Sequence, residues 1–206
     1  MAKRGELLFL LLVVAAALLW SGWAPADRLT WLLEIIWVLV GVPILLFTRR
    51  RAPLTRLLYW LIAAHCLILI VGGRYTYAQV PLGFWFQDAF DLARNHYDRL
   101  GHFAQGFVPA VLARELLLRN TPLRPGGWLF YLVTCSALAF SAFFEMIEWW
   151  SALIWGGAAD AFLATQGDPW DTQWDMFTCL LGAIASLLLW SRLHDRQLGS
   201  PVAGKP

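Results

Sequence analysis

Six stretches of apolar residues constrain this chain more than any other feature, because each approaches or reaches the length that a helix needs to cross a bilayer. They cover residues 7–23, 29–47, 57–73, 100–118, 128–149 and 174–190. Backbone groups in lipid must bond within their own segment, so such runs predict helices. The sequence therefore predicts an all-α, polytopic integral membrane protein. Its bundle of six transmembrane helices forms a single domain over residues 1–198, followed by a flexible cytoplasmic tail at 199–206.

Composition supports the bilayer as the main partner. The chain is 59% hydrophobic, and its mean hydropathy is +0.57. A net charge of +2, with no basic run interleaved with aromatics, argues against nucleic acid as a partner. The three cysteines all lie inside apolar runs, which argues against a disulfide framework. These patterns do not indicate an oligomeric state.

The first apolar run has two interpretations. Ala24-Pro25-Ala26 has the small-x-small shape of a signal cleavage site, which would make residues 1–26 a removable signal. A retained helix is favoured, because a second apolar run follows after a short gap.

Lysine and arginine gather on one side of the predicted topology. That side carries Lys3, Arg4, Arg49, Arg50, Arg51, Arg56, Arg114, Arg119, Arg124, Arg192, Arg196 and Lys205. The other side carries Arg28, Arg74, Arg94 and Arg99. Because cytoplasmic loops are rich in Lys and Arg, both termini are predicted to be cytoplasmic.

Polar residues from three of the runs meet at the extracytoplasmic end of this topology. They are Asp98, His102, Glu145, Glu148, Asp171 and Asp175. Spacings of three or four residues place each successive pair on one helix face. Ionisable residues at membrane depth usually face a bundle interior or a watery cavity, so this cluster is the candidate site.

Three interpretations of the cluster remain open. His102, Glu145 and Asp175 have the oxygen and nitrogen donors that hold a divalent metal. Alternatively, a catalytic set acts as general acid and base while a second set binds the anionic headgroup of a lipid-linked substrate. The catalytic candidates are His102, Glu145, Glu148 and Asp175, and the binding candidates are Arg99, Arg74, Asp98 and Asp171. In the third interpretation the acids only cap helices and pair with bases, as Asp98 and Asp171 would at helix starts.

Other charged residues are interpreted more simply. Glu34 either leans into the same cavity or makes a structural hydrogen bond, and His65 is expected to hydrogen-bond between helices. Asp160 and Asp168 are interpreted as solvated. A small transporter or channel is a further alternative, as is a non-catalytic scaffold. Whether the protein is an enzyme stays open.

Three motifs resemble those of the YjdF-type bacterial inner-membrane proteins, a family described by a domain of unknown function. The motifs are His96-Tyr97-Asp98-Arg99-Leu100-Gly101-His102-Phe103, Phe144-Glu145-Met146-Ile147-Glu148-Trp149 and Gly167-Asp168-Pro169-Trp170-Asp171-Thr172-Gln173-Trp174-Asp175-Met176. The resemblance covers most of the chain and implies a multi-pass protein of the bacterial inner (cytoplasmic) membrane. It implies no reaction.

A fainter similarity is to VanZ-like membrane proteins, which are associated with glycopeptide (teicoplanin) resistance. Asp98-Arg99 with His102-Phe103 resembles their first motif, and Glu145 with Glu148 resembles their second. Asp175, Cys179 and Gly182 follow the spacing of the third. Glu148 stands where that family has Gln, and Cys179 where it has Asn, so a shared cavity need not imply a shared ligand.

Overall fold

The computed structural model describes residues 2–199 and contains no strand within them. The helices are α1 (Arg4–Trp23), α2 (Arg28–Thr48), α3 (Arg56–Tyr75), η1 (Tyr77–Gln79), α4 (Pro81–Ala89), α5 (Tyr97–Asn120), α6 (Gly127–Trp155), η2 (Gly156–Ala159), α7 (Asp160–Leu163) and α8 (Asp171–Leu198). The predicted all-α fold is confirmed. Of the predicted tail, residues 200–206 lie outside the described part.

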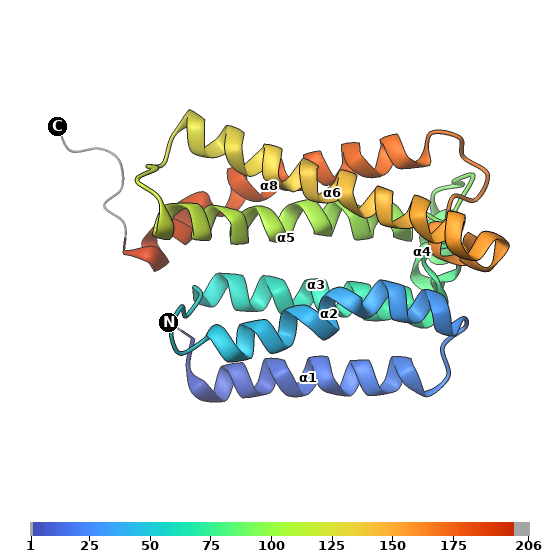
Figure 1. The fold of residues 1–206 in the computed structure, drawn as a ribbon, viewed down its shortest axis with the longest axis horizontal. Coiled ribbons are helices and arrows are strands. Elements are labelled where there is room, and N and C mark those ends of the chain that lie inside the picture. Colours follow the sequence, from blue (N-terminus) through green and yellow to red (C-terminus); the bar gives the residue numbers. More distant parts are fainter. Residues whose placement is uncertain (1, 200–206) are drawn as a thin grey trace.

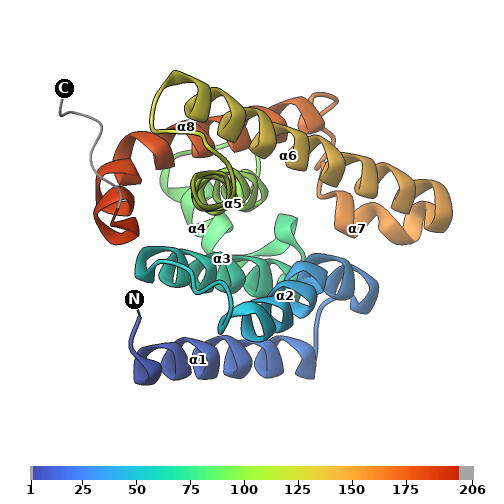
Figure 2. The ribbon, with the colours of Figure 1, turned by 60° about the vertical axis from the view of Figure 1, so that its left-hand side comes forward.

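Successive long helices are antiparallel and form two groups (Figure 1). One group contains α1, α2 and α3, and the other contains α5, α6 and α8. The groups meet mainly where α3 packs on α5 (Figure 2). α1 begins and α8 ends at the same end of the bundle, and α4 lies at the opposite end (Figure 1). We call these the terminal end and the α4 end. The membrane side that each end faces stays a prediction.

Five helical segments are long and apolar enough to cross a membrane: α1, α2, α3, α6 with its continuation to residue 163, and α8. α5 is not among them, although its 24 residues would span about 36 Å at 1.5 Å per residue. Charged residues near both of its ends lower its hydropathy, and several of these residues are buried. The count of six crossings therefore stays a prediction.

α5 and α8 form the most extensive helix contact. A Cβ atom added at Gly106 of α5 would overlap the backbone carbonyl of Cys179, and one added at Gly182 of α8 would overlap that of Phe103. The two backbones therefore touch directly, as small residues permit between membrane helices. This close approach fixes the distance between the polar side chains of α5 and those of α8.

Candidate functional site

His102 lies at the centre of a buried polar cluster near the α4 end, where α5, α6 and α8 meet. Its Nε2 is 3.6 Å from Oδ1 of Asp98, one turn earlier on α5, and its Nδ1 is 3.7 Å from Oε1 of Glu145 on α6. The Phe144 ring packs edge-on against the imidazole at 5.8 Å. Both ring nitrogens thus face carboxylates, at distances too long for direct hydrogen bonds.

Asp175 of α8 completes the cluster. One ligand atom each from Asp98, His102 and Asp175 lies within 4.8 Å of the others. His102, Glu145 and Asp175 are only 3%, 8% and 2% exposed. Yet His102 Nδ1, Glu145 Oε1 and Asp175 Oδ1 have no hydrogen-bond partner among the described residues. Buried polar atoms are nearly always bonded. His102 Nδ1 and Glu145 Oε1 face each other at 3.7 Å, and Asp175 Oδ1 is available to a ligand or water.

A small cavity of about 20 Å³ adjoins His102 on the side of α2. Glu34, Tyr77, Glu148 and Gln105 line it together with His102. This volume is about that of one ordered water. Glu34 therefore lines the same cavity as His102, in agreement with one of its two interpretations. Glu148 lines this cavity too, whereas the carboxylates that face the imidazole nitrogens are those of Asp98 and Glu145.

Ion pairs made by Arg94 and Arg99 join the segments at the α4 end. Arg94 donates to Asp171 at 2.6 Å and to Asp168 at 3.3 Å, and Arg99 donates to Asp168 at 2.7 Å. Arg99 also lies 5.2 Å from the Trp174 ring centre. The interpretation of Asp168 as a solvated residue was wrong, because two guanidinium groups hold it.

The same two arginines contribute to shifted pKa values of two groups outside the membrane-spanning helices. The Trp170 amide donates to Asp168 at 2.9 Å, and together with Arg99 and Arg94 it holds the pKa of that carboxyl below its usual value. Partial burial, reinforced by Arg99 and Arg94, lowers the pKa of His96. Arg94 and Arg99 are therefore already committed to carboxylate partners within the chain.

A reciprocal amide pair joins the two loops at this end. The backbone N–H of Asn95 donates to Gln166 Oε1 at 3.1 Å, and Gln166 Nε2 donates to the Asn95 carbonyl at 2.8 Å. The connection between α3 and α5 and the connection between α6 and α8 are thus bonded to each other at this end of the bundle. The first of them also contains the short helix α4.

The structure brings some of the predicted site residues together and separates others. Asp98, His102, Glu145 and Asp175 converge, and Asp171, one turn before Asp175 on α8, pairs with Arg94. Arg74 lies elsewhere, 5.5 Å from the Trp20 ring centre on α1. Sequence reasoning did not place Arg94, Tyr77 or Gln105 in the site. The position of Gln105 three residues after His102 was the available signal, whereas a loop residue such as Arg94 has no periodicity to reveal it.

His65 differs from its predicted role. Its Nε2 is buried and has no hydrogen-bond partner among residues 2–199, so the expected bond between helices is not made. The imidazole instead lines a mostly apolar groove of about 300 Å³ between α2, α3, α5 and α6.

A second buried network lies at the terminal end and was not expected. Glu115, fully buried on α5, accepts from the Thr55 backbone at 3.0 Å, from His194 Nε2 at 2.9 Å and from Arg119 at 2.6 Å. Arg114 donates to His194 Nδ1 at 2.8 Å. Since an arginine only donates, His194 Nδ1 is the acceptor and Nε2 carries the proton given to Glu115. This network is satisfied, unlike the His102 cluster.

Fold and site together define a polytopic, all-helical membrane protein with a buried histidine and carboxylate cluster between its helices. The chain belongs to the family described as predicted membrane protein (DUF2238), whose model matches residues 6–196. It is 53% identical over 187 residues to the inner membrane protein YjdF of Escherichia coli (strain K12), covering 91% of this chain and 90% of that protein. No solved structure matches the chain.

These comparisons confirm the resemblance to the YjdF-type family and identify an integral, multi-pass inner-membrane protein. The VanZ-like similarity gains no support from them and stays a prediction.

Proposed function

We propose that the protein binds a divalent cation at the His102 cluster and uses it to hold the phosphate of a lipid-linked substrate. The observation that carries the proposal is the convergence of buried donor atoms from Asp98, His102 and Asp175, among which Asp175 Oδ1 has no hydrogen-bond partner among the described residues. Leaving such groups unpaired costs about 1–3 kcal/mol each, and more when they are charged. A cation would offset that cost.

The spacing of the donors suits an ion. Metal ligands lie about 2.0–2.6 Å from the ion, so ligands on opposite sides are about 4–5 Å apart. The grouped atoms of Asp98, His102 and Asp175 lie within 4.8 Å of one another. One imidazole and two carboxylates favour Mn²⁺ or Zn²⁺ over Ca²⁺. This set differs in one carboxylate from the sequence-based set of His102, Glu145 and Asp175.

Glu145 has a separate role in the proposal. The Nε2 of His102 is on the Asp98 side and would face the ion, which leaves Nδ1 to Glu145 at 3.7 Å. Metal-binding histidines usually donate their second N–H to a carboxylate, which fixes the tautomer and the ring orientation. A small ring rotation would shorten that contact to a hydrogen bond, so Glu145 is a positioning residue in this arrangement.

Charge explains why an anionic headgroup would need the ion. Arg94 and Arg99 are engaged by Asp168 and Asp171, and Arg74 contacts Trp20. The remaining carboxylates would repel a phosphate. A bound cation supplies the missing attraction and polarises the phosphate. Direct binding of the headgroup by Arg99 or Arg74 is not part of the proposal.

The neighbouring groove favours a substrate with a hydrocarbon chain. Leu69, Gln105 and Phe144 line both the 20 Å³ cavity beside His102 and the 300 Å³ groove beyond it. Apart from His65 and Gln105, the groove is lined mainly by apolar residues, and its rim includes the exposed Ile44. Such walls suit a lipid tail better than a path for ions, which ranks the transporter alternative lower.

The test is complementation of a strain that lacks the protein, with growth and lipid-linked intermediates as readouts. His102→Ala and Glu145→Gln are expected to accumulate in the membrane but to fail to restore the wild-type lipid profile. Asp160→Asn, an exposed carboxylate on α7, is the matched control and should complement. The proposal is wrong if both site variants complement fully. It is also wrong if Glu145→Gln complements while Glu145→Leu does not accumulate, because Glu145 is then structural.

A further inference from the structure

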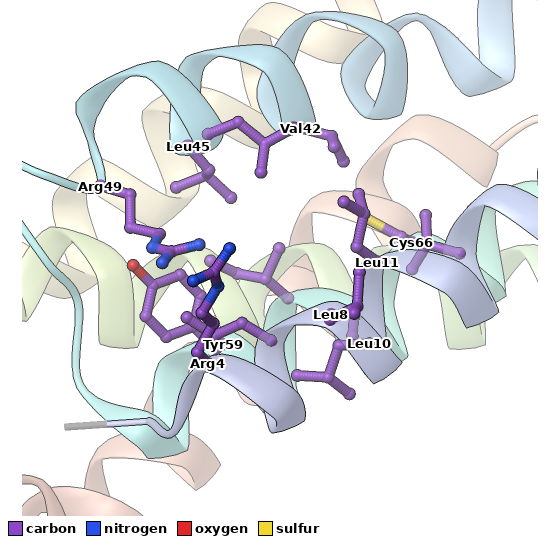
Figure 3. Close-up of a pocket in the computed structure, with 14 residues that line it drawn as sticks. Arg4, Leu8, Leu10, Leu11, Val42, Leu45, Arg49, Tyr59 and Cys66 are labelled. Carbon is purple, nitrogen blue, oxygen red and sulfur yellow. The ribbon is translucent and has the colours of Figure 1, made fainter.

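A second groove of about 300 Å³ opens between α1, α2 and α3 at the terminal end of the bundle. Its walls are aliphatic, with Leu8, Leu11, Val42 and Leu45 among them. Figure 3 shows the guanidinium groups of Arg4 and Arg49 pointing toward each other across it, beside the Tyr59 ring. The groove therefore combines a cationic mouth with an apolar interior.

The two arginines of this mouth have no ion-pair partner among residues 2–199. The nearby carboxylate, Glu6, is engaged elsewhere: it pairs with Arg56 at 2.6 Å and also accepts from Trp60 and the Lys3 amide. Two guanidinium groups that face each other repel, and an anion between them would convert that repulsion into attraction.

Tyr59 adds a donor at the same mouth. Its hydroxyl oxygen accepts from the Leu54 amide at 3.3 Å, which leaves the hydroxyl proton available to a ligand. Two forked guanidinium groups and one hydroxyl match the oxygens of a phosphate, for which arginine is well suited.

We propose that this groove binds an anionic phospholipid, with its phosphate between Arg4 and Arg49 and one hydrocarbon chain against α1 and α2. Inorganic phosphate would satisfy the arginines but leave the aliphatic walls unfilled. Leu8 and Leu46 line the groove and are 54% and 49% exposed, so its rim opens toward the surrounding lipid. Basic pockets between membrane helices are known to bind lipid headgroups in this way.

The inference is independent of the His102 cluster. The arginine mouth lies at the terminal end, whereas His102 lies near the α4 end, and Arg4, Arg49 and Tyr59 line neither the cavity beside His102 nor the groove beyond it. The apolar walls are shared in part, because Val42, Leu45, Ile62 and Cys66 line both 300 Å³ grooves. Loss of lipid binding at Arg4 and Arg49 would therefore leave the proposed cation site unaffected.

The experiment measures lipid binding to the purified full-length chain in detergent by native mass spectrometry. Phosphatidylglycerol is the probe, and phosphatidylcholine and inorganic phosphate are the comparisons. Wild type is expected to bind phosphatidylglycerol selectively, and Arg4→Gln with Arg49→Gln should weaken that binding about 30-fold. This factor corresponds to about 1 kcal/mol for each arginine near a lipid headgroup.

Two further variants make the test specific. Arg50→Gln with Arg51→Gln removes the same charge from exposed positions next to Arg49 and should leave binding within about twofold of wild type. Leu11→Phe, at a position that lines this groove but not the one beside the His102 cluster, should weaken phosphatidylglycerol binding without creating phosphate binding. Equal losses in the two double variants would overturn the proposal, since general surface charge would then explain binding. Tight binding of inorganic phosphate that Leu11→Phe does not alter would overturn its lipid part.

Discussion

Replacement of Gly106 by alanine tests the close contact that aligns the site. The added methyl group would overlap the backbone carbonyl of Cys179, and this neighbour is not a flexible side chain that can turn away. Non-bonded carbon atoms prefer about 3.5–4.0 Å, so α5 and α8 would have to separate or shift by about 1 Å or more. That displacement would move Asp98 and His102 away from Asp175.

The expected cost follows from overpacking, which typically destabilises by about 1–3 kcal/mol. Alanine would otherwise be favoured over glycine within a helix by about 0.5–1 kcal/mol. We therefore expect Gly106→Ala to lower the free energy of unfolding by about 1–3 kcal/mol. Gly41→Ala is the matched control, because nothing lies within 4 Å of a Cβ at this position in α2, and it should be neutral or slightly stabilising.

Reversible unfolding in mixed micelles, followed by circular dichroism, gives the two free energies. Cation binding by the same proteins reports whether the site has moved, and Gly106→Ala should weaken it while Gly41→Ala should not. If Gly106→Ala is as stable as Gly41→Ala and binds cation equally well, the direct backbone contact between α5 and α8 is wrong.

Two other predictions concern the ends of the bundle. Glu115→Ala should lower the free energy of unfolding by about 3–5 kcal/mol, because it strands His194 and the Thr55 amide within a buried network; equal stability with wild type in the same unfolding assay would contradict this. Asp168→Asn should destabilise the protein at pH 7 by releasing Arg99. Since the folded pKa of Asp168 is lowered, its contribution is present above the unfolded pKa of about 3.9 and is lost as the pH falls through the lower folded pKa. Wild type and variant should therefore converge in thermal midpoint at low pH, and a difference that persists unchanged down to pH 2 would refute the ion pair.

The sequence predicted most of the fold because bilayer thickness and backbone hydrogen bonding leave a long apolar run few choices. The helices themselves run further than the apolar runs did. α8 extends over Asp171–Leu198 rather than 174–190, and α6 continues to Trp155. Polar and aromatic residues at such ends interrupt the hydropathy signal without ending the helix, so boundaries were the least predictable part.

The core of the candidate site was predictable for a related reason. Asp98 and His102 share a face of α5 by their spacing, and the alternation of antiparallel helices brings Glu145 and Asp175 to the same end. The direction of long or loop-borne side chains was not predictable. Arg74 contacts Trp20, and Arg99 is drawn to Asp168, because partners that are distant in sequence decide where a flexible guanidinium points.

The terminal network shows a different limit. In the sequence, a basic residue near the end of a membrane helix indicates which side of the membrane that end faces, and Arg114 was interpreted only in that way. In the structure it is 3% exposed and pairs with Asp195 at 2.6 Å. Burial there depends on the packing of α3, α5 and α8, which no local pattern encodes.

The central claim is that His102 binds a divalent cation, and electron paramagnetic resonance of Mn²⁺ bound to the purified protein tests it most directly. The account predicts one tightly bound Mn²⁺ that shows nitrogen hyperfine coupling from an imidazole. Both the coupling and tight binding should be lost in His102→Ala and retained in Asp160→Asn. Stoichiometric Mn²⁺ binding that His102→Ala leaves unchanged, or no binding of Mn²⁺ or competing Zn²⁺ by the wild type, would contradict the account.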